Sequence, residues 1–304
     1  MKAIKTLTLM FFMVVSLALK AQTPTDAFTM EKGQLCPVLA YQYDTWEKYW
    51  EGSLFRINKN LGTVTSHTVM PMFALGLNNR FTVIASFPWM QKATSAGTLN
   101  KEKGWQDLSL WLKALVFKQN LGEKNSVDAF ASVGYTAPLG GYYADYLPLA
   151  LGSGSNQLNT RLILTWRHSS GIFASVMGGY DFRSNIDIDR TNYYIDQHYL
   201  TNELYMPNVI SASITAGYFK NLSRVELKYN IMDTDGGQDI RRNDQPYPSN
   251  NMDNGRVELF VQQRMPFYDP LGVIASVAYT TSGRNVPQAL SYGVGLQMLI
   301  QLWK

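Results

Sequence analysis

The stretch GWQDLSLWLKALVFK, residues 104–118, determines the fold class of the chain. Between residues 107 and 117, small or aliphatic side chains alternate with a mixed set that includes Asp107, Ser109 and Lys113. A repeat of two residues indicates a β-strand, because successive side chains of a strand point to opposite faces. The apolar face of this strand consists of Leu108, Leu110, Leu112, Ala114 and Val116. The fold depends on whether protein or lipid covers that face.

The same alternation recurs along most of the chain and predicts about twelve strands. Most of these segments have about ten or more residues, whereas strands of soluble proteins average about 5–6. About 9–11 tilted residues are needed for a strand to cross the core of a bilayer. The predicted strands are 34–46, 64–77, 81–89, 107–117, 127–136, 158–166, 171–183, 210–218, 225–231, 256–262, 271–282 and 290–302.

The connections between these strands are alternately short and long. The short ones lie at 78–79, 120–125, 168–170, 221–222 and 266–270, and the long ones near 47–63, 92–105, 139–155, 184–208, 234–253 and, shorter, 283–288. Tight turns at one end and long loops at the other are typical of an up-and-down antiparallel outer-membrane barrel. The sequence therefore predicts an all-β fold, a single transmembrane barrel with short periplasmic turns and long extracellular loops.

Lipid is the better solvent for the apolar face. A closed sheet of about eight strands can fill its own interior, but about twelve strands leave a lumen too wide to be filled by single side chains. Aromatic residues lie near the predicted strand ends, where interfacial girdles belong: Tyr41, Tyr43, Trp89, Tyr135, Trp166, Tyr180, Tyr218, Tyr279, Tyr292 and Trp303. The alternative is that these aromatics pack in a secreted all-β core.

The first residues predict export. Lys2 and Lys5 precede an apolar run that ends before Ala21, the pattern of a cleaved signal peptide over residues 1–21. Residues 22–304 then form one barrel domain. Cys36 is the only cysteine, so no intramolecular disulfide is expected. The net charge of +4 is spread along the chain without a basic run, which argues against nucleic-acid binding.

The opposite face of the strands would line the lumen, and it carries charges of both signs. We expect these charges to pair across neighbouring strands. Such pairs either hold the strands of the wall together or bias the passage of ions and solutes. The candidate residues of the solute path are Asp107, Lys113, Asp128, Arg161, Asp181, Arg183, Arg224, Glu226, Lys228, Arg256, Glu258 and Arg264.

One predicted extracellular loop is unusually apolar for a solvated position. Its large residues are Tyr142, Tyr143, Tyr146, Leu147, Leu149 and Leu151. One interpretation is that this loop folds inward as a constriction or as an entry patch for an apolar solute. The other is that it packs on other long loops or in lipopolysaccharide at the rim of the barrel.

Short motifs suggest a family. Residues 76–119 contain a strand, an Asn78-Asn79 turn, a strand that ends in Phe-Pro-Trp at 87–89, and the segment GWQDLSL at 104–110. Pro-Leu-Gly at 138–140 and LGSGS at 151–155 follow. This pattern resembles the outer-membrane barrel family of transporters labelled with the meta-pathway of phenol degradation, most clearly over 60–183. The resemblance implies uptake of small, often aromatic or apolar, molecules. Trp105 and Trp111 depart from the small residues usual in the family.

Catalytic and metal-binding patterns are weak. Ser66 and His67 could suggest a barrel-type phospholipase, but neighbours in a strand point to opposite faces and should not pair. The acidic loop with Asp233, Asp235 and Asp239 lacks the spacing of a calcium loop. We therefore expect no catalytic residue, metal or cofactor.

The sequence thus predicts a bacterial outer-membrane channel for passive uptake of small molecules. Its expected partners are outer-membrane lipid or lipopolysaccharide and a small-molecule solute, and its oligomeric state is left open. A structural or surface-binding barrel with a closed lumen is the alternative, and an outer-membrane lipid hydrolase is a more distant one.

Overall fold

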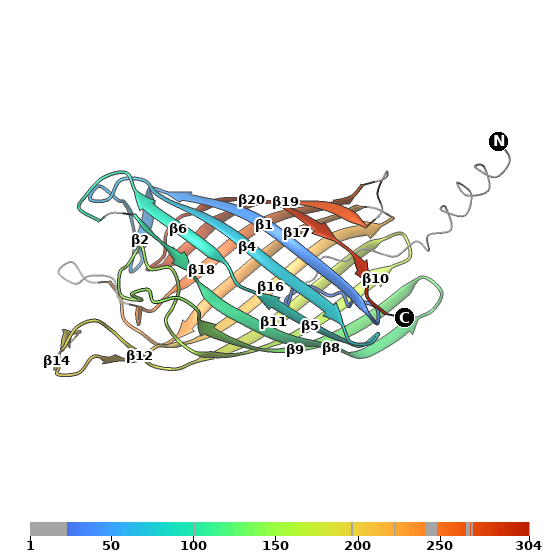
Figure 1. The fold of residues 1–304 in the computed structure, drawn as a ribbon, viewed down its shortest axis with the longest axis horizontal. Helices are drawn as coiled ribbons and strands as arrows, with labels where there is room; N and C mark the ends of the chain where they lie inside the picture. The colour runs from blue at the N-terminus through green and yellow to red at the C-terminus, as the bar shows by residue number, and fades with distance from the viewer. Residues whose placement is uncertain are drawn as a thin grey trace.

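The computed structural model describes residues 23–99, 101–195, 197–221, 223–240, 248–265, 268 and 270–303. The predicted signal peptide, 1–21, lies outside these residues and stays a prediction. Within the described residues, no helix has the length and hydropathy needed to span a membrane. Strands account for nearly all the regular structure (Figure 1).

Twelve antiparallel strands form one closed barrel, because β1 pairs both with β4 and with β20, so that the first and last strands meet. Three of the twelve are each divided into two segments: β5 with β6, β7 with β8, and β20 with β21. The bounds are β1 (Gln34–Trp46), β4 (Val64–Gly76), β5 (Phe81–Ser86), β6 (Trp89–Thr94), β7 (Glu102–Trp105), β8 (Asp107–Leu121), β9 (Asn125–Pro138), β10 (Gln157–His168), β11 (Ile172–Arg183), β16 (Asn208–Lys220), β17 (Ser223–Asp235), β18 (Asp253–Arg264), β19 (Leu271–Arg284), β20 (Leu290–Met298) and β21 (Ile300–Gln301). The predicted fold class is therefore confirmed.

The apolar face of the opening stretch lies on the outside of the barrel. Leu110 is 53% exposed, and Leu108 and Leu112 are also exposed. Trp111 and Lys113, which alternate with them, are buried on the inside. On the outer surface the Tyr41 hydroxyl and His67 Nδ1 share a hydrogen bond of 2.7 Å. With an apolar exterior and every strand paired on both sides, the wall suits a lipid environment.

The two ends of the barrel differ as predicted. Turns between paired strands are short at the end where the described C-terminus lies, and the long connections gather at the opposite end (Figure 1). We call these the turn end and the loop end. Three small two-stranded sheets stiffen the long loops: β2 (Lys48–Glu51) with β3 (Leu54–Ile57), β12 (Ile186–Asp187) with β15 (Glu203–Leu204), and β13 (Tyr193–Tyr194) with β14 (His198–Tyr199).

One predicted loop, 92–105, is wrong in its bounds. β6 continues to Thr94 and β7 begins at Glu102, and the two strands pair with Lys92 opposite Glu102. The loop itself is thus only 95–101. The strand is interrupted instead at Pro88, which has no N–H to give to the sheet. The Pro88 carbonyl accepts a hydrogen bond from the Gln106 amide at 2.9 Å, so β6 resumes its pairing directly afterwards.

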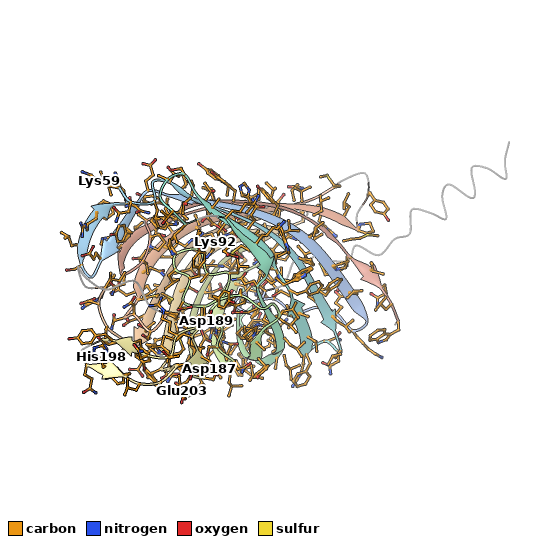
Figure 2. The ribbon with its side chains drawn as sticks, turned by 60° about the vertical axis from the view of Figure 1, so that its left-hand side comes forward. Lys59, Lys92, Asp187, Asp189, His198 and Glu203 are labelled. Atoms are coloured by element: carbon orange, nitrogen blue, oxygen red, sulfur yellow. The ribbon has the colours of Figure 1, made fainter. Side chains whose placement is uncertain are left out.

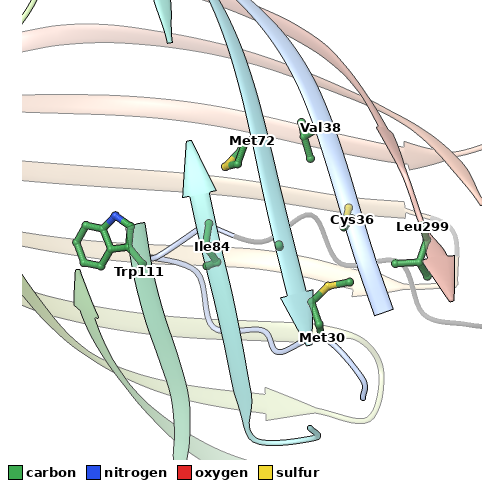
Figure 3. Packing of buried hydrophobic residues seen from close by; sticks show 8 residues of the cluster. Met30, Cys36, Val38, Met72, Ile84, Trp111 and Leu299 are labelled. Atoms are coloured by element: carbon green, nitrogen blue, oxygen red, sulfur yellow. The ribbon is translucent and has the colours of Figure 1, made fainter. Parts of the chain in front are cut away.

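Residues 23–33, which precede β1, enter the lumen; we call them the N-terminal segment. Met30 of this segment is buried in a cluster with Cys36, Val38, Met72, Ala74, Ile84, Trp111 and Leu299 (Figure 3). All the strand residues of this cluster lie on the inner wall. The main hydrophobic core of the protein is therefore inside the barrel, and the N-terminal segment contributes to it.

Candidate functional site: the barrel lumen

All twelve charged residues predicted to line the lumen belong to inward-facing positions of their strands, as the register of the sheet shows. Toward the turn end lie Lys113, Asp128, Arg224, Glu226 and Arg264, all buried. Toward the loop end lie Asp107, Arg161, Asp181, Arg183, Lys228, Arg256 and Glu258. Their role in a solute path stays a prediction.

The N-terminal segment is held at the turn end by an ion pair. Lys113 Nζ lies 2.6 Å from Asp26 Oδ1, and the lysine side chain is fully buried. The same ammonium donates to the carbonyl oxygens of Thr23 at 2.8 Å and Asp26 at 3.2 Å. Arg224 Nη1 lies 3.9 Å from Asp26 Oδ2. Two cations of the wall therefore converge on one carboxylate of the segment.

Phe28 occupies a pocket of cations and rings. The guanidinium carbons of Arg167 and Arg224 lie 4.5 and 4.3 Å from the centroid of its ring. The rings of Phe173 and Phe219 meet it edge to face, with centroids 5.7 and 5.0 Å away. A guanidinium over an aromatic face and aromatic pairs at these angles are both favourable contacts.

Backbone contacts complete the anchoring of the segment. Ser132 donates to the Pro24 carbonyl at 3.0 Å, and Arg167 donates to the Ala27 carbonyl. The Met30 amide donates to Thr82 Oγ1 at 3.2 Å. These bonds satisfy main-chain groups that would otherwise be buried without partners. The segment is thus a docked, hydrogen-bonded element of the lumen.

The ionisation of Asp26 reflects this environment. Burial by itself raises the pKa of the carboxyl, but the attraction of Lys113 and Arg224 and the hydrogen bonds to the carboxylate outweigh it, so the pKa lies below its ordinary value. The carboxylate is therefore charged at neutral pH, and Lys113 and Asp26 act as a buried ion pair.

Cross-strand pairing, the expected arrangement of the lumen charges, is formed by two ion pairs between described residues. Arg161 on β10 lies 2.6 Å from Asp181 on β11, and Arg167 on β10 lies 3.0 Å from Asp128 on β9. Two further ion pairs of the lumen are not cross-strand pairs. Arg224 pairs with Glu226 of its own strand at 2.7 Å, and Lys113 pairs with the N-terminal segment.

Arg161 also stacks on Trp111, with its guanidinium carbon 5.3 Å from the ring. Space for the indole exists because Gly134 lies beneath it: a Cβ at that position would sit 2.3 Å from Trp111 Cδ2. Trp111, an unusual residue for the family that the sequence resembles, therefore has a defined place on the inner wall.

A third group of charges lies on the inner face of β17 and β18. Lys228, Arg256 and Glu258 are half-buried, and none of them forms an ion pair with another described residue. Asn230 donates to Glu258 at 3.4 Å. Charged groups in such positions keep their solvation only if water reaches them. The loop-end half of the lumen beside β17 and β18 is therefore wet.

The apolar loop 139–155 reaches the inner wall. Lys92, on the inward face of β6, donates to the Ala150 carbonyl at 2.5 Å (Figure 2). The Tyr142 hydroxyl donates to Asp107, and burial together with this bond raises the pKa of Tyr142 well above its ordinary value. Leu149 and Leu151 are buried, Tyr142, Tyr146 and Leu147 are half-buried, and Tyr143 is exposed.

The same loop also packs on a second loop, as the alternative interpretation expected. Ala144 shares a cluster with Ile186, Ile188, Tyr193, Leu204 and Met206 of the connection 184–208, and Tyr142 packs against this cluster. The loop therefore contacts both the inner wall and the connection 184–208. Its role as a constriction or entry patch stays a prediction.

Residues considered for chemistry are not assembled into a site. Ser66 is buried on the inner face of β4, whereas His67 faces outward and bonds to Tyr41. In the acidic loop, Asp239 pairs with Arg284 at 2.5 Å and accepts from Asn285 at 2.9 Å. The hydrogen bond from Arg284 keeps the pKa of Asp239 below its ordinary value.

Sequence reasoning missed the residues of the N-terminal segment and one residue of the wall. Arg167 continues the inward alternation of Arg161 and Thr165 and could have been found from that parity. Asp26 and Phe28 belong to no periodic pattern, and no signal in the sequence places them in the lumen.

A closed twelve-stranded barrel with an apolar outside and a charged, partly wet inside is an outer-membrane β-barrel. The chain is similar to the COG4313 outer membrane channel from Pseudomonas putida F1, with a TM-score of 0.71 and 13% identity over 93% of this chain and 100% of the other. It also aligns with the translocator domain of the autotransporter NalP from Neisseria meningitidis, with a TM-score of 0.48 and 12% identity over 98% and 96% of the two chains. No family model and no curated protein matches this sequence.

Proposed function

We propose that this protein is a passive outer-membrane channel for small molecules. The observation that carries the proposal is the wet, charged lumen wall around Lys228, Arg256 and Glu258. A barrel with a purely structural role gains nothing from half-exposed charges on its inside, whereas a channel uses them to hydrate and select what passes. The likeness in fold to a solved outer membrane channel supports this choice.

The solute class that we propose is small and aromatic or apolar. The resemblance to the family labelled with phenol degradation supports it, as does the apolar loop 139–155 that covers the inner wall near Lys92. An apolar depression of about 590 Å³ on the wall over β8 to β11, lined by Leu112, Ala131, Leu162 and Gly178 among others, is a surface that such a solute would contact from the membrane. Transport would be diffusion, without catalysis, metal or cofactor.

A closed structural or surface-binding barrel is the second candidate. The docked N-terminal segment favours it, because Asp26, Phe28 and Met30 fill the turn end of the lumen. Under the channel proposal this segment is a closure that can be displaced. Lipopolysaccharide around the outer face and a small solute inside remain the proposed partners.

Liposome swelling and single-channel recording separate the two candidates. The purified protein is compared with a variant lacking residues 23–31. We expect the variant to show larger and more frequent current steps, and swelling in small sugars and aromatic solutes. If neither protein conducts or swells liposomes, the channel proposal fails and the closed barrel stands.

A further inference from the structure

The pocket that holds Asp26 and Phe28 has the chemistry of a ligand site. Its carboxylate half consists of Lys113 at 2.6 Å and Arg224 at 3.9 Å. Its aromatic half consists of the guanidinium groups of Arg167 and Arg224 and the rings of Phe173 and Phe219, which stand nearly perpendicular to the Phe28 ring. We propose that this pocket binds an aromatic carboxylate, and that Asp26 and Phe28 occupy it in place of that ligand. The inference rests on the proposed channel function and names its solute class.

The charge of the pocket selects an anion. When the N-terminal segment leaves, Arg167 keeps Asp128 and Arg224 keeps Glu226. Lys113 loses every hydrogen-bond and ion-pair partner that it has among the described residues, because all of them belong to the segment. A buried ammonium without a counter-ion is strongly unfavourable. A neutral aromatic molecule would leave that charge unpaired, and a cation would add to it.

The walls of the pocket select a ring. Phe28 lies against two guanidinium groups, at 4.5 and 4.3 Å, and against two aromatic rings nearly perpendicular to its own. Guanidinium groups are attracted to the electron-rich face of an aromatic ring and not to an alkyl chain. Acetate or a short fatty acid could neutralise Lys113 but would lose these contacts.

The separation of the two halves selects a short spacer. Arg224 touches both, since its Nη1 lies 3.9 Å from the Asp26 carboxylate and its Cζ lies 4.3 Å from the Phe28 ring centroid. A small ligand with its carboxylate close to its ring can reach both halves through this one guanidinium. Phenylacetate and 3-phenylpropanoate have this form.

Such a ligand must compete with the N-terminal segment. Two occupants of one pocket exclude each other, so ligand binding shifts the population toward the state with the segment released. The protein contains a reporter of that release. Cys36, its only cysteine, is fully buried in the cluster that includes Met30 of the segment and Leu299 (Figure 3). Release of the segment would expose this thiol to the lumen.

The first experiment measures the rate at which a small, water-soluble thiol reagent modifies Cys36 in the full-length protein purified in detergent. Phenylacetate is compared with acetate, toluene and phenethylammonium at matched concentrations. We expect phenylacetate to raise the rate at least about tenfold and in a saturable way, and the other three to change it by less than twofold. No effect of phenylacetate, or an equal effect of acetate or toluene, would overturn the inference.

The second experiment uses variants that move the affinity in opposite directions. Asp26→Ala combined with Phe28→Ala removes the internal competitor and should lower the Kd of phenylacetate, measured by calorimetry, at least about tenfold. Asp26→Asn combined with Lys113→Met keeps a neutral buried pair but removes the anion site, and should raise the Kd at least about tenfold. Lys32→Ala, on the exposed part of the segment, is the matched control. If both double variants weaken binding alike, the segment has only a structural role and the inference is wrong.

The test of the ligand site and the test of the channel can fail independently of each other. Liposomes that swell without any effect of phenylacetate on Cys36 or on calorimetry would overturn the ligand site and leave the channel standing. Phenylacetate binding with the predicted variant pattern, in a protein that never conducts, would support the site and overturn the channel.

Discussion

The Lys113 ammonium lies 2.6 Å from the Asp26 carboxylate, and both side chains are buried inside the barrel. This pair joins a strand of the wall to a segment that is not part of the sheet. Removing both charges from a buried pair is often nearly neutral, but removing one leaves the other buried alone. The N-terminal segment, unlike the wall, can escape this cost by leaving the lumen.

Lys113→Met should therefore release the segment without unfolding the barrel. Breaking a buried pair costs about 3–5 kcal/mol, and the Asp26 carboxylate regains its hydration when the segment moves into water. We expect larger mean single-channel conductance in planar bilayers than for the unchanged protein, with the same heat-modified electrophoretic mobility. Asp26→Asn together with Lys113→Met is the control, and it should conduct like the unchanged protein. Equal conductance for all three would contradict the role assigned to the pair.

Acid should release the segment through Asp26. The charged groups around this carboxylate are Lys113, Arg224 and Arg167, the last two paired with Glu226 and Asp128. Because the docked pKa of Asp26 lies below its ordinary value, its contribution to docking is complete above that ordinary value and is lost as the pH falls through the docked pKa. Conductance should thus be constant between about pH 5 and 8 and rise toward pH 3.

The control for this pH dependence is Asp26→Asn, in which the rise attributable to the segment should be absent. Ionic strength should be kept high, so that changes in the exposed charges of the loops contribute little. A rise centred near pH 6 to 7 in the unchanged protein would assign the titration to another group.

The alternation of apolar and polar residues predicts most of the strands of the barrel and the face on which their side chains lie. The weaker candidate strand near 34–46 corresponds to β1, and the parity of residues 107–117 places Leu110 outside and Lys113 inside. Period two is a local property of the chain, so it needs no knowledge of partners. The bounds of the predicted loop 92–105 are wrong because Lys92 and Glu102 face each other across paired strands, a long-range contact that the local alternation does not reveal.

The alternation of residues could not predict that residues 23–33 fill part of the lumen. Asp26 lies 87 residues from Lys113 in the chain, and Ala27 lies 140 residues from Arg167. Residues 23–33 are irregular, so they show no periodicity that would orient their side chains. Charges on the inner face predicted that partners exist, but a mixed-charge wall gives equal reason to expect cross-strand pairs.

Loop 139–155 gives a third prediction. Deleting residues 142–150 removes the Tyr142 bond to Asp107 and the contact of Ala150 with Lys92. If this loop narrows the path, conductance should increase. Combined with Lys113→Met, the increase should exceed the sum of the two single increases, because two narrowings at opposite ends of one lumen are resistances in series. Tyr143→Ala, at an exposed position of the same loop, is the matched control and should leave conductance unchanged. Unchanged conductance after the deletion would remove the loop from the solute path.

The assignment of lipid to the outside of the barrel and solute to the inside can be tested on a single strand. Ile214 on β16 is 64% exposed on the outer face, and Ser211, three residues away, lies on the inner face. An arginine near the bilayer midplane on the lipid side costs about 2–4 kcal/mol, whereas one in a wet lumen keeps its hydration. Ile214→Arg should therefore lower the free energy of unfolding by that amount in urea titrations of the protein in liposomes.

Ser211→Arg is the matched substitution on the lumen side, and it should lower the free energy of unfolding by less than Ile214→Arg does. It should also shift the reversal potential of the channel toward anion selectivity, because it adds a positive charge to the path. Equal destabilisation by the two substitutions would mean that the two faces of β16 meet the same medium, and the assignment of lipid to the outside and solute to the inside would be wrong.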